Sequence, residues 1–525
     1  MTASAAEPYG LAVIGAGPAG LAGAVTAAEL GVSVALLDAS PQTGGQFYRH
    51  PAPAMGAVRP EALHHDWSTF AGLYRRLAAS DVTHLAGHHV WTVAKEADGL
   101  WTVHAVTGDD GNGEQPVQVR ARTVLLATGA YERQLPFPGW TLPGVVGAGG
   151  AQAMLKSGLV LPGKRVVVAG SGPLLLAVAS SLAAAGARVP AVVEAAGYLR
   201  YARHPVALAA NPHKLVEAAV HGSALLRNRV PLRLRSAVTE VHGTARVEAV
   251  TVSRLDSDWR PVRGSGRRIA CDALAVGHGL VPQIELATTL GCATRPLSDR
   301  TSALVLDDRQ ETSVRNLWAA GETGGIGGVQ LACTEGELAG LAIAARLGLR
   351  PTHSGRAGKL LRSRGRMRRF ADVMTAAHAP GSGWPRWLAD DTEVCRCEEV
   401  TAGCIHEAVT ELGARDARSV KLLTRAGMGW CQGRTCGTAV ACLAAGGGAV
   451  GGGAVGGSTT DGGSAAGSTT DAGAVNGGAV EALAERRPIA VPVTLSALGA
   501  LPEPGDSPAQ SPETTKTTKT TKTTS

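Results

Sequence analysis

The segment Gly15-Ala-Gly-Pro-Ala-Gly20 constrains the fold of this chain more than any other. It follows a short apolar stretch, Leu11 to Ile14, and precedes an alanine-rich stretch typical of a helix. In such a strand–turn–helix unit Gly15 permits the tight turn, Gly17 lets a pyrophosphate approach the backbone, and Gly20 lets helix and strand pack closely. Asp38 ends the next apolar stretch, where its carboxylate can accept hydrogen bonds from ribose hydroxyls. The segment therefore predicts a dinucleotide-binding βαβ unit.

A second turn of related pattern follows the apolar stretch that begins at Val166. It keeps Gly170 and Gly172, but Leu175 stands in place of the third glycine, and Glu194 ends the following apolar stretch. An acid at that position favours NAD over NADP. Two alternatives stay open, a site for NAD or another adenine nucleotide and a scaffold that binds no nucleotide. The predicted fold class is α/β, with two Rossmann-like nucleotide-binding domains.

Three further segments favour FAD over NAD at the first turn: Gly44-Gly45-Gln46, Ala127-Thr128-Gly129 and Ala320-Gly321-Glu322. They resemble the fingerprints of two-dinucleotide-binding flavoproteins. In that family the residue at the Glu322 position meets the ribityl chain and is usually Asp, so the longer Glu can differ in its contacts. The resemblance also implies that the helix after Gly328 points its N-terminus at the flavin pyrimidine, where a positive dipole stabilises negative charge on reduced flavin.

Four cysteines near the C-terminus can ligate a metal centre: Cys395, Cys397, Cys431 and Cys436. Their C-x-C and C-x-x-x-x-C spacing suits either a [2Fe–2S] cluster or a structural zinc and does not decide between them. The surrounding sequence over residues 393–445 resembles the bacterioferritin-associated-ferredoxin (BFD) type of [2Fe–2S] domain, which implies that these four thiolates are the cluster ligands. Cys404 and Cys442 are then expected to be helix-packing residues, because free cysteine is commonly buried.

Composition excludes several other classes. The net charge of +7 is not concentrated in one block, which argues against nucleic acid as a partner. Nine cysteines are not spread as a disulfide framework, and we find no unbroken apolar stretch of about 18 residues, so a cytoplasmic location without a transmembrane segment is expected, with peripheral membrane association left open. No C-x-x-C lies near either turn, which disfavours a flavin–dithiol reductase.

The patterns divide the chain into seven parts. We expect an FAD-binding domain split over 8–138 and 288–350, a second nucleotide-binding domain over 139–287, a basic linker over 351–392, the [2Fe–2S] domain over 393–445, a glycine-rich linker over 446–486, a docking segment over 487–501 and a disordered tail over 502–525. The arginines between Arg356 and Arg369 are expected to form the solvated face of a linking helix.

The combination of these parts, over about residues 8–445, resembles the flavoprotein A (alpha) subunit of heteromeric amino-acid-type dehydrogenases of the opine oxidase, hydrogen cyanide synthase and L-proline dehydrogenase type. The resemblance implies that a separate flavin-containing beta subunit oxidises an amine, amino-acid or opine-type C–N bond. Electrons would then pass through the [2Fe–2S] centre and FAD of this chain to an acceptor, and a small ferredoxin-like subunit is a further expected partner. No catalytic residue is predicted in this chain. The alternatives are a stand-alone NAD(P)H:acceptor oxidoreductase and a non-catalytic iron–sulfur binding or redox-sensing module.

Overall fold

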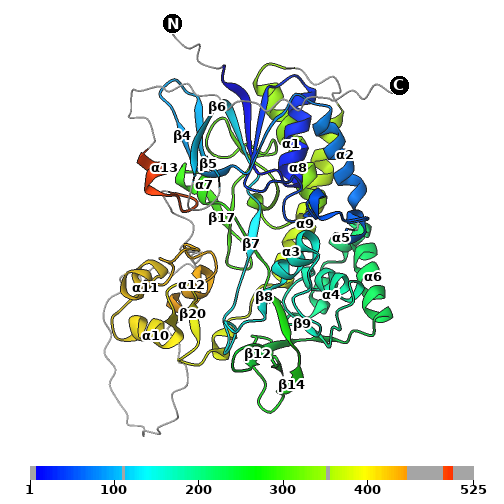
Figure 1. Cartoon of the computed structure of the whole chain (residues 1–525), viewed down its shortest axis with the longest axis vertical. Coiled ribbons are helices and arrows are strands. Elements are labelled where there is room, and N and C mark those ends of the chain that lie inside the picture. Colours follow the sequence, from blue (N-terminus) through cyan, green and yellow to red (C-terminus); the bar gives the residue numbers. More distant parts are fainter. Residues whose placement is uncertain (1–6, 65, 109–112, 350–354, 446–488, 500–525) are drawn as a thin grey trace, which may run out of the picture.

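The computed structural model describes residues 7–64, 66–108, 113–349, 355–445 and 489–499. Two α/β bodies, each built on its own β-sheet, lie one above the other in Figure 1. A small helical domain lies beside them. The predicted glycine-rich linker and disordered tail fall outside the described residues. Within the described residues, no helix is long and apolar enough to cross a membrane.

The first body is built on a seven-stranded sheet in the order β3-β2-β1-β6-β5-β4, with β19 paired to β6. Its strands are β1 (Tyr9–Ile14), β2 (Val34–Asp38), β3 (Thr83–Ala86), β4 (His89–Lys95), β5 (Trp101–Thr107), β6 (Gln115–Leu126) and β19 (Leu317–Ala319). The strands β3, β2, β1, β6 and β19 run parallel, while β4 and β5 continue the sheet antiparallel. Strand β19 lies about 190 residues after β6 in the sequence, so the second body is an insertion within the first.

Helices α1 (Pro18–Glu29), α2 (Trp67–Ala78) and α8 (Val329–Arg346) pack on the first sheet. Helices α1 and α8 touch backbone to backbone, because a Cβ on Gly336 would lie 2.0 Å from the carbonyl oxygen of Ala19. Strands β1 and β2 are buried on both faces, which explains why their sequences are almost continuously apolar.

The second body has a five-stranded parallel sheet in the order β11-β10-β9-β15-β8. Its main elements are β8 (Val145–Gly147), α3 (Ala148–Gly158), β9 (Val166–Gly170), α4 (Leu174–Ala184), β10 (Val192–Glu194), η3 (Tyr198–Arg203), α5 (Pro205–Ala209), α6 (Pro212–Arg227), β11 (Leu232–Leu234) and β15 (Ala273–Gly277). A separate antiparallel sheet holds β12 (Ser236–His242), β13 (Ala249–Arg254) and β14 (Arg267–Ala270). The bodies are joined where β7 (Ala130–Glu132) pairs antiparallel with β16 (Leu280–Pro282).

Shorter elements complete the described chain: η1 (Pro53–Met55), η2 (Pro60–Leu63), α7 (Glu285–Thr289), β17 (Thr294–Pro296), β18 (Ser302–Leu304), η4 (Gly321–Gly324) and η5 (Trp384–Trp387). The small helical domain contains β20 (Glu393–Cys395), β21 (Val400–Thr401), α10 (Ala402–Thr410), α11 (Ala417–Thr424) and α12 (Gly437–Ala445). The hydroxyl of Thr401 caps α10 by accepting a bond from the Cys404 amide at 3.3 Å.

Helix α9 (Arg356–Ala377) runs from the first body to the second and precedes the small domain. The prediction of a solvated basic face holds for Arg362, Arg366 and Arg369, which are exposed. It is wrong for Arg364 and Arg368, because both side chains turn inward and contact a carboxylate of α8. Helix α9 is therefore docked on the first body through its charged side chains.

Residues 489–499 lie against the outer strands of the first sheet and end in α13 (Leu495–Gly499) (Figure 1). The amide of Ala490 donates to the Trp91 carbonyl at 2.8 Å, and Ala497 is buried in a cluster with Trp91 and Val106. This apolar stretch thus packs on β4 and β5, with an extended part followed by a single short helix.

Candidate cofactor sites

The first turn has a shape that only glycine permits. Gly15 has φ of +105°, and a Cβ there would lie 2.4 Å from the Ala127 carbonyl oxygen. A Cβ on Gly20 would lie 1.8 Å from the Gly15 carbonyl oxygen. Gly17 is the N-cap of α1, so the free N–H groups of the first helical turn face the turn itself. The turn and the start of α1 therefore form the kind of cradle that a dinucleotide pyrophosphate requires.

The loop after β2 lies directly on this turn. The amide of Gly44 donates to the Ala16 carbonyl at 2.8 Å, and a Cβ on Gly45 would lie 2.8 Å from the Cα of Gly17. Asp38 accepts bonds from the main-chain N–H groups of Ala16 at 2.5 Å and Ser40 at 2.6 Å and remains partly exposed. Gln46 follows, and its side-chain oxygen accepts a bond from Arg49 at 2.7 Å. The loop at Gly44 and the turn at Gly15 therefore lie together at one edge of the sheet.

Two distant segments reach the same edge. Thr128 donates to the Gln283 carbonyl at 2.6 Å, and Gly129 has φ of +77°. Gly321 has φ of +80°, and a Cβ there would lie 3.0 Å from the Cβ of Ala19 in α1. The turn at β1, the end of β6 and the end of β19 therefore meet beside the start of α1.

Glu322 reaches the loop before α8. Its carboxylate accepts bonds from the amides of Gly327 at 2.6 Å and Gly328 at 3.0 Å. Burial raises the pKa of Glu322, and the two amide bonds only partly oppose that effect. The carboxylate thus occupies the N-terminal end of α8, the position from which the sequence expected a helix dipole to act.

The second turn keeps its backbone shape. Gly170 has φ of +135°, and a Cβ there would lie 1.7 Å from the Gly277 carbonyl oxygen. Leu175, which stands in place of the third glycine, is buried in the core of the second body. The two oxygens of Glu194 accept bonds from the amides of Gly172 at 3.0 Å and Ala196 at 2.9 Å, and the carboxylate is fully buried. The turn is therefore preserved, but its acid is sealed from solvent.

The four predicted cysteine ligands come together in the small domain. Cys395 is a neighbour of Cys436, and Cys397 is a neighbour of Cys431, because each thiol shifts the pKa of the other. Cys395 and Cys436 are buried, Cys431 is half-buried and Cys397 is exposed. The neighbouring Cys436 thiol lowers the pKa of Cys395 to about 6. The Gly427 amide is also 3.4 Å from the Cys395 sulfur.

The pairing of the thiols bears on the kind of centre they could hold. Among the described residues, no three His, Cys, Asp or Glu side chains converge as a single metal ion would require. A [2Fe–2S] cluster has two irons and takes four thiolates in total, and the four neighbouring cysteines supply that number. The donor set thus fits the cluster.

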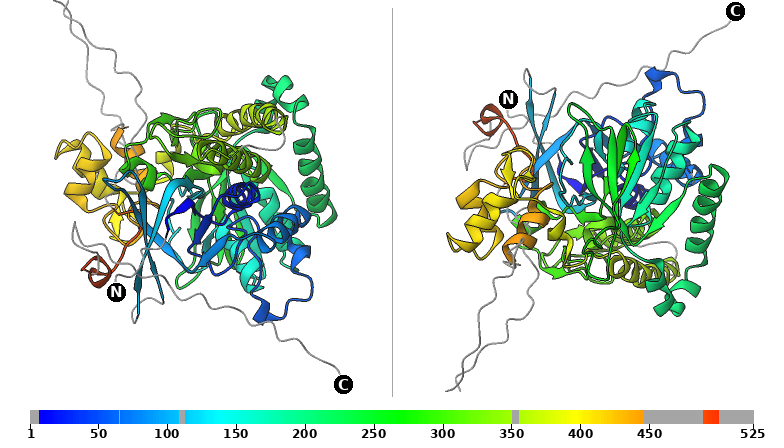
Figure 2. Two further views of the ribbon diagram at one scale, coloured as in Figure 1. Left: turned by 90° about the horizontal axis from the view of Figure 1, so that it is seen from above. Right: turned by 90° about the horizontal axis from the view of Figure 1, so that it is seen from below.

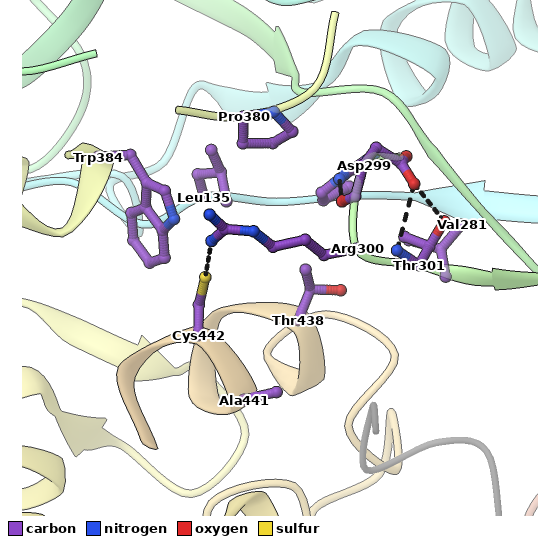
Figure 3. Close-up of a pocket in the computed structure, with 11 residues that line it drawn as sticks. Leu135, Val281, Asp299, Arg300, Thr301, Pro380, Trp384, Thr438, Ala441 and Cys442 are labelled. Carbon is purple, nitrogen blue, oxygen red and sulfur yellow. Dashed lines mark hydrogen bonds and ion pairs between the residues drawn. The ribbon is translucent and has the colours of Figure 1, made fainter. Parts of the chain in front are cut away.

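The two other cysteines of the domain differ from each other. Cys404 is exposed on α10, so the prediction that it packs between helices is wrong. Cys442 is half-buried on α12 and lies at the junction with the body, where the guanidinium of Arg300 reaches its sulfur at 3.4 Å (Figure 3). Figure 3 shows that this junction forms a small pocket with further lining residues from the body and from α12, including Leu135, Val281, Pro380, Trp384, Thr438 and Ala441.

A second contact ties the cysteine loop itself to the body. Arg434 lies between two of the predicted ligands, and its Nε is 3.2 Å from a carboxylate oxygen of buried Glu285 in α7. The same guanidinium donates to the carbonyl of Ala490 in the C-terminal segment. Sequence reasoning missed Arg434 and Glu285, because no local spacing links residues that are about 150 positions apart.

Comparisons with known proteins agree with this architecture. Residues 9–336 match the pyridine nucleotide-disulphide oxidoreductase family, and residues 393–445 match the BFD-like [2Fe-2S] binding domain. The chain is 35% identical over 440 residues to hydrogen cyanide synthase subunit HcnB of Pseudomonas aeruginosa, which covers 81% of this chain and 90% of that protein. It is 34% identical over 441 residues to the A subunit of opine oxidase from Agrobacterium tumefaciens, which covers 82% and 84%.

The fold is also similar to that of a solved L-proline dehydrogenase from P. horikoshii, with a TM-score of 0.57 and 20% identity over 83% of this chain and 74% of that chain. The predicted fold class and the resemblance that the sequence indicated are both confirmed. The chain belongs to the pyridine nucleotide-disulphide oxidoreductase family, as an FAD-dependent oxidoreductase with a C-terminal BFD-like [2Fe-2S] binding domain, in the group that includes hydrogen cyanide synthase subunit HcnB and the A subunit of opine oxidase.

Proposed function

We propose that this chain is the electron-transferring subunit of a heteromeric dehydrogenase, and that a separate flavin-containing subunit oxidises the C–N bond of an amine, amino acid or opine. The observation that carries this proposal is the tie between the two cofactor sites. Arg434, between two predicted cluster ligands, is paired with Glu285 of the body that holds the glycine cradle. An FAD-binding domain fixed against a [2Fe–2S] domain suits the passage of electrons between them.

The roles of individual residues follow from the cradle and the thiol pairs. We propose that FAD is held by Gly15, Gly17, Gly20, Asp38, Gly44, Gly45, Gln46, Thr128, Gly129, Gly321 and Glu322, and the cluster by Cys395, Cys397, Cys431 and Cys436. When bound, FAD would hold up to two electrons and exchange them one at a time with the cluster, which carries one. The chain itself supplies the cradle, the thiolates and the junction between them. We also propose the domain boundaries given in the sequence analysis and a cytoplasmic location.

An apolar surface on the second body supports association with a partner. Leu199, Val206 and Leu226 are 88%, 79% and 81% exposed, and Leu215 and Val216 on α6 are more than half exposed. Figures 1 and 2 place α6 on the side of the molecule opposite the [2Fe–2S] domain. These residues come from η3, α5 and α6, elements that contact one another, and exposed apolar side chains on neighbouring elements are typical of protein–protein contacts.

The test is an anaerobic visible spectrum of the purified chain, recorded before and after addition of NADH, NADPH and dithionite. We expect flavin and iron–sulfur bands that resist both nucleotides and bleach with dithionite. Bleaching by NADH or NADPH within seconds would instead identify a stand-alone NAD(P)H:acceptor oxidoreductase. A spectrum without iron–sulfur absorption would favour zinc at the four cysteines.

The proposed role of the flavin-containing partner subunit is tested by a separate measurement. The chain is mixed with its candidate flavin-containing partner subunit, and an amino acid or opine is added anaerobically. Bleaching of the iron–sulfur band that requires both the partner and the substrate is the expected result. Bleaching without the partner would place substrate oxidation on this chain and contradict the proposal.

A further inference from the structure

The residues that follow α9 lie on the second nucleotide turn. His378 is 8% exposed, and its backbone carbonyl accepts a bond from the Ser171 hydroxyl at 3.2 Å. Its Nδ1 is 3.4 Å from the same hydroxyl and 3.5 Å from a carboxylate oxygen of Glu194. A residue about 200 positions away from the turn thus contacts both the turn and the acid that ends β10.

Aromatic side chains of η3 hold His378 from the other side. The hydroxyl of Tyr201 is 3.0 Å from the His378 Nε2, and the rings of Tyr198 and Tyr201 lie 5.9 Å and 5.7 Å from the imidazole. Tyr201 also stacks on Phe370 of α9 at 6.2 Å. Burial, and then the charge of Glu194, raises the pKa of both tyrosines, so they stay protonated. Arg200 adds a bond to the carbonyl of Ala377 at 3.4 Å.

The first turn of the same chain provides the comparison. Asp38 ends β2 as Glu194 ends β10, and each acid accepts bonds from the main-chain amides of its own turn. Asp38 is partly exposed, whereas Glu194 has no exposed surface. The acid at this position must meet ribose hydroxyls if a dinucleotide is to bind in the usual way. His378 stands where such hydroxyls would have to approach Glu194.

We propose that the second nucleotide turn is a socket for residues 377–378 of this chain and accepts no nucleotide. Two consequences follow. The chain does not take reducing equivalents from NADH or NADPH, and the socket anchors the end of α9 just before the [2Fe–2S] domain begins. The inference does not depend on the proposed electron-transfer role, since a protein that binds NADH without being reduced would refute the socket and leave that role intact.

The first test measures equilibrium binding of NADH and NADPH to the full-length chain by calorimetry under anaerobic conditions. We expect no saturable binding up to about 1 mM, the upper end of the range usual for enzyme substrates. Saturable binding of either nucleotide below that concentration, competed by its oxidised form, would overturn the proposal.

The second test is hydrogen exchange on the full-length chain with His378→Ala, and with His89→Ala, a change at an exposed histidine, as the matched control. We expect the amides of the turn around Ser171 and Gly172 to lose about tenfold or more protection, the effect of one or two net hydrogen bonds. The conservative variant Tyr201→Phe, which keeps the ring, should show a smaller loss and carries the test if His378→Ala does not fold. Protection that matches the control in both variants would overturn the socket.

Discussion

A buried carboxylate joins α9 to the loop that ends β19. Glu335 of α8 has no exposed surface, and one of its oxygens is 2.6 Å from Arg368 and 3.4 Å from Arg364. Its other oxygen accepts a bond from the Gly321 amide at 3.1 Å. We predict that Arg368→Met destabilises the first body, because it leaves this buried charge with weaker partners.

The magnitude follows from the geometry. Removing one partner of a buried ion pair costs about 3–5 kcal/mol. Arg364 and the Gly321 amide remain in contact with Glu335, and methionine fills much of the vacated volume, so we expect the lower end, about 3 kcal/mol. At about 2–4 °C per kcal/mol for a body of this size, the melting temperature should fall by about 6–12 °C.

The assay is differential scanning calorimetry of the FAD-loaded full chain, with FAD occupancy read from the ratio of visible to ultraviolet absorbance. Arg362→Met, an exposed position on the same helix, is the control and should change stability by less than about 0.5 kcal/mol. The double variant with Glu335→Gln should recover part of the loss, since it removes the unpaired charge. A melting temperature for Arg368→Met no lower than that of the control would refute the reasoning.

Three other predictions test the cofactor sites and one buried cation. Gly20→Ala should abolish FAD binding, because its Cβ would lie 1.8 Å from the Gly15 carbonyl oxygen, whereas Gly150→Ala, where a Cβ meets nothing within 4 Å, should retain flavin absorbance. Cys431→Ser should lose iron and the iron–sulfur bands while it keeps FAD, and unchanged iron content would contradict its role as a ligand. Burial lowers the pKa of Lys156 from 10.5 to about 8, so the unfolded state binds more protons between these values. The unfolding free energy of wild type relative to Lys156→Met should therefore rise by about 3 kcal/mol from pH 8 to pH 10.5. Urea unfolding at each pH measures it, and unfolding free energies of the two proteins that change with pH in parallel would exclude this effect.

The parts of the fold that could be predicted from the sequence are those fixed by local spacing. The turn at Gly15 and the loop at Gly44 are each a few residues long, and their glycines are required by close backbone contacts within the same edge of the sheet. The same holds for the cysteine pairs, whose order along the chain matches a known domain. Local spacing therefore predicted these turns and the cysteine domain, while the binding of cofactors by the named residues stays a prediction.

The contacts that could not be predicted join residues far apart in sequence. Arg364 and Arg368 are four residues apart and share one face of α9, yet their neighbours Arg362, Arg366 and Arg369 are equally basic. A run of arginines predicts a solvated face, and only the position of buried Glu335 separates the two sets. His378 carries no motif at all, because its partners belong to a turn that forms about 200 residues earlier. The second turn has the sequence of a nucleotide site, and only the tertiary structure shows what lies on it.

Several of these long-range contacts are made by helix α9 or by the residue that directly follows it. The 22 residues of this helix span about 33 Å, from the contact with α8 of the first body at its start to the turn of the second body just after its end. Arg356, paired with Glu337 of α8, anchors its start, Arg368 anchors its middle, and His378 directly follows its end. The small domain is further held against the first body by the pair of its Arg434 with Glu285 and by the contact of Arg300 with its Cys442. Under the proposed electron-transfer role, these contacts keep the four cysteines against the body that holds the glycine cradle, and the exposed side of the domain, where Cys397 lies, is the side open to a partner.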